Sequence, residues 1–271
     1  MHCFICPVCR SGLLKTEKTY ICENGHSFDI AKKGYVNLLM SQTGGQHGDD
    51  KTMISARADF LNRGFYDALS ARVCRIAEEH CGENARILDA GCGECKYTAD
   101  IAEYFERVGK TCEVIGIDIS KEALGYAKRR TNKLSLAVAS TSNMPVPDES
   151  ADVLVNIFAP FAAEEFARVI KKDGIIIRVY PLARHLWELK ELIYDKPYEN
   201  PEPDMAEQGL CVVARYEVKY KMDFETNEDI MSLFKMTPYF YRTGDEDKKK
   251  LERASNLTCR AEFGIVVYKK K

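Results

Sequence analysis

The fold is decided by one stretch, Arg86-Ile-Leu-Asp-Ala-Gly-Cys-Gly-Glu-Cys95. Its apolar start predicts a strand that ends at Asp89, and Gly91 and Gly93 predict a tight turn because glycine adopts positive φ without strain. Apolar residues at helical spacing over 97–107 predict that a helix follows. A strand, a glycine turn and a helix in this order hold a nucleotide-like ligand at the carboxyl edge of a parallel sheet.

The residues around the turn favour S-adenosylmethionine over a dinucleotide. A dinucleotide fingerprint has a glycine at the sixth position from Gly91, where this chain has Lys96. An acid two residues before the first glycine, Asp89, and a second acid at the end of the next apolar strand, Asp118, fit the S-adenosylmethionine methyltransferases better. A carboxylate in the second position accepts two hydrogen bonds from ribose hydroxyls. We therefore predict a cofactor site that includes Asp89, Gly91, Gly93 and Asp118.

One residue of the turn departs from the usual methyltransferase pattern. Cys95 stands where many such enzymes have a third glycine. Because cysteine tolerates positive φ poorly, we expect the turn to relax one residue earlier than usual. The alternative reading of the whole stretch is a strand, turn and helix whose glycines serve only packing.

The composition indicates one α/β domain with a small appendage. The chain has 271 residues, 45% of them hydrophobic, so it can bury a sizeable core. No apolar run approaches the roughly 18 residues of a membrane span, and no signal peptide is recognised, so we expect no membrane association. Eleven cysteines without an export signal indicate a reducing, cytoplasmic compartment rather than a disulfide framework. The net charge of -2 excludes a wholly basic nucleic-acid coat but allows local basic patches.

The first unit, residues 1–38, is expected to be a zinc-binding ribbon. Its candidate ligands follow the spacing of a zinc knuckle pair: Cys6, Cys9, Cys22 and His26. Three thiolates and one imidazole leave no open coordination position, so the zinc would be structural and would supply folding energy to a segment with little core of its own. Cys3 is a spare thiol, and the alternative is a set of free buried cysteines. Exposed Lys32, Lys33 and Tyr35 are candidates for an RNA-contacting surface.

A linker and a larger domain follow the ribbon. Residues 39–52 are expected to be a linker because 41–52 are polar and glycine-rich, and 53–271 are expected to form the methyltransferase domain. Helices are predicted at about 53–61 and, with Asp67 as cap, up to about residue 80.

Strands and helices alternate through the middle of the chain, which is typical of a doubly wound parallel sheet. Strands are predicted at about 86–90, 113–118, 134–139, 152–158 and 174–180, and helices at about 96–107, 121–130 and 162–170. The last third predicts helices at 184–194 and 227–235 and strands at 211–224 and 259–269. The last two strands would form an antiparallel hairpin that completes a seven-stranded sheet. The predicted fold class is thus α/β, a class I (Rossmann-like) methyltransferase with a small N-terminal zinc ribbon.

The loop after the fourth predicted strand is the candidate site for the methyl acceptor. Asn156 could accept a hydrogen bond from a base N–H, and Phe158 or Phe161 could stack on a base, although both rings suit a core equally well. A serine-threonine turn, 140–142, could contact adenine or be an ordinary turn. The aromatic segment 236–242 could form a base-stacking lip, or it could be core.

Taken together, these motifs resemble the 23S ribosomal RNA (guanine-N1)-methyltransferase family over nearly the whole chain. The residues that carry the resemblance are Cys6-Pro-Val-Cys9, Cys22 with His26, the run 28–39, Leu88-Asp-Ala-Gly-Cys-Gly-Glu94, Phe158-Ala-Pro160 and Arg184-His-Leu-Trp-Glu-Leu-Lys190. The resemblance implies methyl transfer to N1 of one guanine in a hairpin loop of 23S ribosomal RNA, by a homodimer that forms a basic cleft.

The same resemblance implies specific ligands. It implies zinc on the three cysteines and the histidine of the ribbon, and S-adenosylmethionine contacts from Tyr66, Gly93, Glu94 and His185. Two alternatives remain at this point: a methyltransferase that acts on a small molecule, and a non-catalytic zinc-ribbon protein that binds RNA. Salt-sensitive binding to an RNA hairpin separates the first from the proposed enzyme, and binding of S-adenosylmethionine excludes the second.

Overall fold

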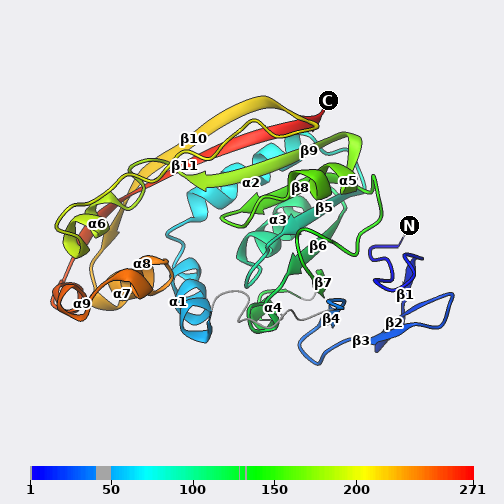
Figure 1. Ribbon diagram of the computed structural model, residues 1–271, viewed down its shortest axis with the longest axis horizontal. Coiled ribbons are helices and arrows are strands. Elements are labelled where there is room, and N and C mark those ends of the chain that lie inside the picture. The colour runs from blue at the N-terminus through cyan, green and yellow to red at the C-terminus, as the bar shows by residue number, and fades with distance from the viewer. Residues whose placement is uncertain (1, 41–49, 128, 132) are drawn as a thin grey trace.

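The computed structural model describes residues 2–40, 50–127, 129–131 and 133–271 (Figure 1). The expected linker residues 41–49, including His47, lie outside the described residues. The larger sheet contains β4 (Tyr35–Asn37), β5 (Ala85–Ala90), β6 (Cys112–Asp118), β7 (Ser135–Val138), β8 (Ala151–Ile157), β9 (Ile170–Pro181), β10 (Leu210–Phe224) and β11 (Leu257–Lys270).

This sheet has the order β10-β11-β9-β8-β5-β6-β7-β4 within the described residues. Strands β4 to β9 pair in parallel, whereas β11 runs antiparallel to both β9 and β10. The seven predicted strands and the final hairpin are all present. The strand order reverses between β5 and β8, so the carboxyl ends of these two strands border a crevice of the kind in which open α/β sheets bind ligands.

The prediction of seven strands was one too few, because β4 adds an eighth. Tyr35, Val36 and Asn37 pair in parallel with Leu136–Val138 of β7. This strand falls inside the segment that was expected to belong to the ribbon, 1–38. Three residues are too short to show a strand periodicity, and the open edge of β7 rather than the local sequence determines their conformation.

The central strands are buried on both faces, as expected for a parallel sheet. Successive residues point to opposite sides, so Ile87 belongs to one core and Leu88 to the other. Helices α2 (Asp67–Glu79), α3 (Lys96–Arg107) and α4 (Lys121–Ala127) contribute apolar side chains to the core of Ile87. Helix α5 (Ala163–Val169) contributes to the core of Leu88.

The zinc ribbon covers much of the sheet face on which Leu88 lies. Its own three-stranded sheet consists of β1 (Leu13–Lys15), β2 (Thr19–Cys22) and β3 (Ser27–Asp29), paired antiparallel. Its fully buried Phe4 and Leu13 lie in the same core as Leu88 and Ile117, and the Ile5 amide donates to the Pro145 carbonyl at 2.9 Å. Each such apolar side chain contributes roughly 1.5–3 kcal/mol when buried, so the ribbon is fixed to the sheet.

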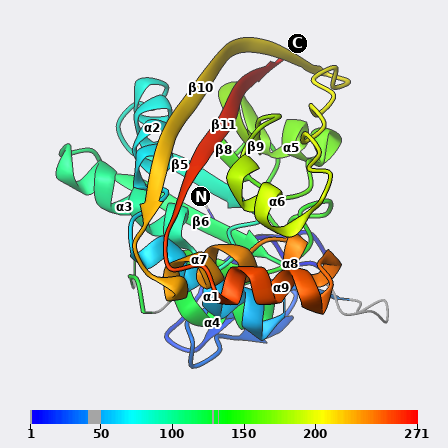
Figure 2. The same ribbon diagram turned by 90° about the vertical axis from the view of Figure 1, so that its left-hand side faces the viewer.

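A row of helices lies at the carboxyl edge of the sheet (Figures 1 and 2). It contains α1 (Lys51–Asn62), α4, and the three helices inserted between β10 and β11, namely α7 (Asn227–Lys235), α8 (Tyr239–Arg242) and α9 (Asp245–Glu252). Helix α6 (Trp187–Ile193) follows β9. None of the helices in the described part of the chain is both long and apolar enough to cross a bilayer.

The expected cap of α2 was wrong by one residue. Tyr66 is the N-cap, without a side-chain cap bond, and Asp67 is the first helical residue. An acid in the first turn still interacts favourably with the helix dipole. The Asp67 carboxylate also pairs with the Lys96 ammonium at 3.1 Å, which turns Lys96 toward α2.

Candidate active site and zinc ribbon

The glycine turn between β5 and α3 is fastened to the neighbouring strand β6. The amides of Gly91 and Cys92 both donate to the Ile117 carbonyl, at 2.8 and 3.0 Å. The Gly93 amide donates to the Asp118 carboxylate at 2.8 Å, and the same carboxylate accepts from the Ser120 amide at 2.8 Å. The turn therefore has one conformation, and Asp118 is part of what maintains it.

Cys95 shows that the expected relaxation of the turn was wrong. Gly91, Gly93 and Cys95 all have positive φ, at 88°, 54° and 66°. Cys95 is fully buried as the N-cap of α3, with its Sγ 3.6 Å from that of Cys92. A non-glycine residue in this region costs roughly 1–3 kcal/mol, which the hydrogen bonds and packing of the turn offset.

Two acids of the predicted site are buried beside the turn. Asp89 is 2% exposed and accepts a hydrogen bond from the Thr98 hydroxyl at 2.6 Å. Burial raises the pKa of the Asp89 carboxyl to about 7 against the opposing effect of the Thr98 bond, and the nearby Asp118 and Glu94 carboxylates raise it further. Burial also raises the pKa of Glu94, although Glu94 forms an ion pair with Arg130 at 3.0 Å.

Tyr66 and His185, 119 positions apart in the sequence, are in contact in the fold. Burial lowers the pKa of His185 to about 3, so its ring is neutral at physiological pH. The Glu262 amide donates to Nδ1 at 3.1 Å, which leaves the ring proton on Nε2. Nε2 lies 3.2 Å from the Tyr66 hydroxyl oxygen and donates to it. The Tyr66 hydroxyl proton is therefore available to a ligand.

A cavity of about 1260 Å³ brings the predicted cofactor residues together. Its lining includes all seven of them: Tyr66, Asp89, Gly91, Gly93, Glu94, Asp118 and His185. The serine-threonine turn 140–142 lines the same cavity. Helices α1 and α8 supply further lining residues from outside the sheet. Residues from many separate parts of the chain thus surround one volume.

Asn156 lies behind the cavity wall. It is 1% exposed and is not among the described residues that line the cavity. Its side-chain amide donates to the Ala90 carbonyl at 2.9 Å and to the Pro160 carbonyl at 3.3 Å. Asn156 therefore joins the end of β5 to the loop that follows β8, and it shapes that loop from beneath.

Several aromatic side chains also line the cavity. Phe158 is 46% exposed and has a positive φ of 54°, the kind of strain that is found at functional sites. Phe161, Tyr198 and Tyr239 also line the cavity. In the predicted lip 236–242, all residues except Phe240 and Tyr241 line it; Phe240 instead packs edge-on against Phe234 of α7.

Sequence reasoning missed several lining residues that come from helices and loops. Arg57 of α1, Tyr97 of α3, Arg178 of β9 and Tyr198 all line the cavity. Tyr97 lies just after the glycine turn in the sequence, and this position could have identified it as a residue of the site. The others carry no motif, because their role depends on which elements the fold places at the carboxyl edge of the sheet.

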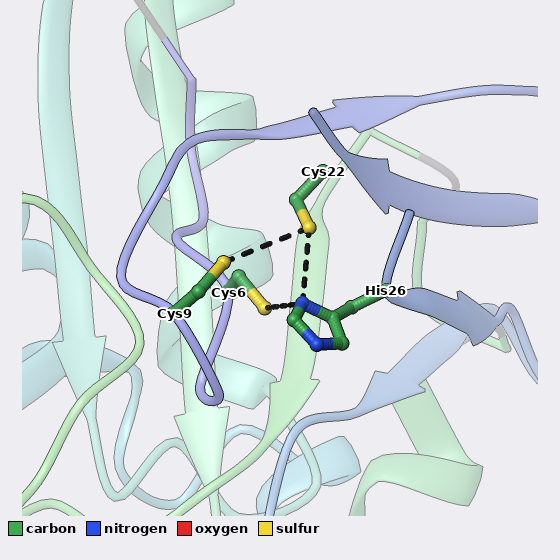
Figure 3. A group of neighbouring side chains, drawn as sticks. All are labelled: Cys6, Cys9, Cys22 and His26. Carbon is green, nitrogen blue, oxygen red and sulfur yellow. Dashed lines mark hydrogen bonds between the residues drawn. The ribbon is translucent and has the colours of Figure 1, made fainter. Parts of the chain in front are cut away.

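The four predicted metal ligands converge in the ribbon (Figure 3). Their ligand atoms lie within 4.8 Å of one another. The Cys9 and Cys22 sulfurs are 3.7 Å apart, and His26 Nδ1 lies 3.4 Å from Cys22 Sγ and 3.6 Å from Cys6 Sγ. Tetrahedral zinc with bonds of about 2.3 Å separates its sulfur ligands by roughly 3.8 Å, so the donor set fits a closed structural site. Cys3 stays outside the cluster, beside the Tyr20 hydroxyl.

The fold and the site define a class of enzyme. The parallel sheet reverses its strand order beside a glycine turn and has a hairpin at one edge. Acids lie at the carboxyl ends of two adjacent strands. These features define the catalytic domain of a class I methyltransferase that uses S-adenosylmethionine. A protein-family model described as "Methyltransferase domain" matches residues 82–254. A second family model, described as "RlmA, N-terminal" and representing a zinc ribbon, matches residues 4–43.

Comparison with known proteins shows to which family of methyltransferases the chain belongs. The chain is 30% identical to a Bacillus subtilis protein named "Putative 23S rRNA (guanine-N(1)-)-methyltransferase YxjB", over 97% of this chain and 96% of that protein. It is 35% identical to the 23S rRNA (guanine(748)-N(1))-methyltransferase of Streptomyces fradiae, over 69% and 66% of the two chains. A solved methyltransferase from Anaeromyxobacter dehalogenans shares the fold, with a TM-score of 0.52 and 19% identity over 73% and 95% of the two chains. The chain belongs to the 23S ribosomal RNA (guanine-N1)-methyltransferase family, as its motifs indicated.

Removal of one zinc ligand tests the metal site. Cys22→Ala should abolish the binding of about one zinc per chain and expose the amides of β1 to β3 to hydrogen exchange, because the ribbon depends on the metal for its fold. Metal analysis and exchange mass spectrometry measure both effects. Cys3→Ala, which removes a thiol outside the cluster, is the matched control and should retain zinc. Full zinc content in Cys22→Ala would contradict the assignment.

The raised pKa of Asp89 predicts a pH dependence of donor binding. S-adenosylmethionine carries an ammonium and a sulfonium, so it should bind best when Asp89 is ionised. With a pKa of about 7 in the free protein, the affinity should be about tenfold lower at pH 6 than at pH 8. Calorimetry across this range measures the change. Asp89→Asn should remove this pH dependence of the affinity. An affinity of the unaltered protein that stays constant between pH 6 and pH 8 would show that the charge of Asp89 does not affect donor binding.

Proposed function

We propose that the protein transfers a methyl group from S-adenosylmethionine to N1 of one guanine in a hairpin loop of 23S ribosomal RNA. The observation that carries this proposal is one cavity that is lined both by the glycine turn with its acids and by several aromatic side chains. The printed names of the relatives supply the acceptor atom and the RNA. The attached zinc ribbon supports a macromolecular acceptor over a small molecule.

The donor end of the cavity would be built from the seven predicted residues. Asp118 would accept the ribose hydroxyls, and the turn 140–142 would border the adenine. The Tyr66 hydroxyl, whose proton His185 leaves free, would donate a hydrogen bond to the bound donor. When bound, S-adenosylmethionine supplies a methyl group that its sulfonium already activates, so these residues need only fix its direction.

The acceptor end would bind the guanine between aromatic rings. Phe158 at the strained loop and Tyr198, 44% exposed, offer ring faces beside the cavity. Asn156 would act as a positioning residue, since it fixes the loop that carries Phe158 to the end of β5. Among the described lining residues the only carboxylates are Asp89, Glu94 and Asp118, all beside the glycine turn. The N1 proton would therefore leave to water.

We extend the proposal to the assembly and location of the enzyme. We infer a homodimer whose cleft accommodates the RNA hairpin, with the exposed Lys32 and Lys33 of the ribbon as part of the contact surface. We also infer a cytoplasmic enzyme, because all eleven cysteines are unpaired by disulfides.

Reverse transcription of treated ribosomal RNA tests the function. Incubation with unmodified large-subunit RNA and labelled donor should label the RNA and produce one new transcription stop opposite a guanine in a hairpin loop. The stop is expected because a methyl group on N1 blocks the Watson–Crick edge. Labelled RNA without a stop would indicate another atom, and label in small molecules only would contradict the RNA substrate.

Substitution of Asp118 tests the donor end. Asp118→Ala should weaken S-adenosylmethionine binding by about 100-fold, since it removes two hydrogen bonds to a charged group and loosens the turn at Gly93. Asp152→Ala is the matched control, because this carboxylate likewise accepts from a backbone amide, that of Arg86, but at the opposite end of the sheet. Calorimetry should show unchanged donor affinity for Asp152→Ala. Equal effects of the two substitutions would remove Asp118 from the site.

A further inference from the structure

Tyr97 carries a polar group that the unliganded protein leaves unused. Its hydroxyl is buried and has no hydrogen-bond partner among the described residues, yet the side chain lines the cavity. A buried donor without an acceptor costs roughly 1–3 kcal/mol, so its retention calls for a partner. Burial raises the pKa of Tyr97 well above its usual value, so the hydroxyl is a neutral donor that seeks an acceptor.

Arg57 reaches the same end of the cavity from α1. Its Nη1 lies 3.9 Å from the position that a Cβ on Gly93 would take, so the guanidinium lies over the glycine turn. Arg130 forms the close ion pair with Glu94, through Nη2 at 3.0 Å, and bonds the Glu94 carbonyl through Nε at 3.1 Å. A guanidinium has five N–H donors, so Arg57 can bind a ligand acceptor in addition to its contacts within the protein.

The other arginines of the cavity are placed elsewhere. Arg178 lies 4.3 Å over the ring of Phe161 and pairs with Glu207 at 3.3 Å, so its charge already has a compensating acid. Arg242 ends α8, in the segment that carries Tyr239. Lys96, next to Tyr97 in the sequence, is held by Asp67 and Asp100.

We propose that Arg57 and Tyr97 form the subsite for the carboxylate of the donor's amino-acid end. The carboxylate is the only anionic group of S-adenosylmethionine, and it must lie near Asp89 and Glu94 if the donor spans the glycine turn. The Asp89 and Glu94 carboxylates would repel the donor's carboxylate, and the Arg57 guanidinium offsets this repulsion. The Tyr97 hydroxyl donates a hydrogen bond to the same carboxylate. This subsite rests on the proposed function, which supplies the donor.

Binding of two donors that differ only in the carboxylate tests the subsite. Decarboxylated S-adenosylmethionine keeps the adenosine, sulfonium and amine. The unaltered protein should bind S-adenosylmethionine about 100-fold more tightly than the decarboxylated compound. Arg57→Met should bring the two affinities within a factor of about three by weakening S-adenosylmethionine alone, and Tyr97→Phe should reduce the ratio about tenfold.

Two matched substitutions serve as controls. Arg178→Met removes another cavity arginine, and Tyr194→Phe removes another buried hydroxyl that has no partner among the described residues but does not line the cavity. Both should leave the affinity ratio unchanged. Tyr97→Phe should not lower the melting temperature, since its hydroxyl forms no bond in the free protein.

The outcomes separate the subsite from the proposed function. If the unaltered protein binds S-adenosylmethionine and Arg57→Met and Tyr97→Phe both keep the ratio, the subsite is overturned and the methyltransferase proposal stands. An unaltered protein that binds the two compounds equally would also overturn it. If neither compound binds, both proposals fail.

Discussion

The hydrogen bonds between the glycine turn and β6 are the constraint on which the rest of the structure depends. The Ile117 carbonyl accepts from two successive amides of the turn, and the Asp118 carboxylate accepts from a third. These bonds impose positive φ on three residues within five positions, one of which is Cys95. Because the turn is fixed to β6, Asp89 of β5 and Asp118 of β6 line one cavity.

The zinc ribbon has a structural function beyond any contact with RNA. Phe4 and Leu13 are buried in the same core as Leu88, and β4 continues the large sheet beyond β7. The ribbon therefore takes the place that a covering helix would have on this face of a doubly wound sheet. Its metal site and the catalytic domain are mechanically connected, so a loss of zinc would disturb the sheet through its edge strand.

The sequence predicted those parts of the fold whose local pattern agrees with the tertiary structure. The glycine turn, the alternating strands and the Cys-His spacing of the ribbon each carry their signal within a few residues, and all three are present. Prediction was wrong where tertiary contacts override local preference. Cys95 adopts a glycine-like conformation because the turn requires it, and β4 is a strand because the edge of β7 was open.

The same distinction applies to the site. Motifs or the family resemblance pointed to seven candidate cofactor residues, and the fold places all seven at one cavity. Arg57 and Tyr198 could not be predicted, since a lone arginine in a helix and a lone tyrosine in a loop resemble surface residues until the fold places them at the cavity. Asn156 was expected to face a base but lies beneath the wall, because its amide satisfies the Ala90 and Pro160 carbonyls.

The central claim is that the glycine turn after β5 is the place where the donor binds. A crystal structure of the full chain with S-adenosylhomocysteine tests this most directly. The ribose should lie at the Asp118 carboxylate and the amino-acid end against Gly93, beneath Arg57. Density for the nucleoside elsewhere on the protein, with the turn unliganded, would contradict it.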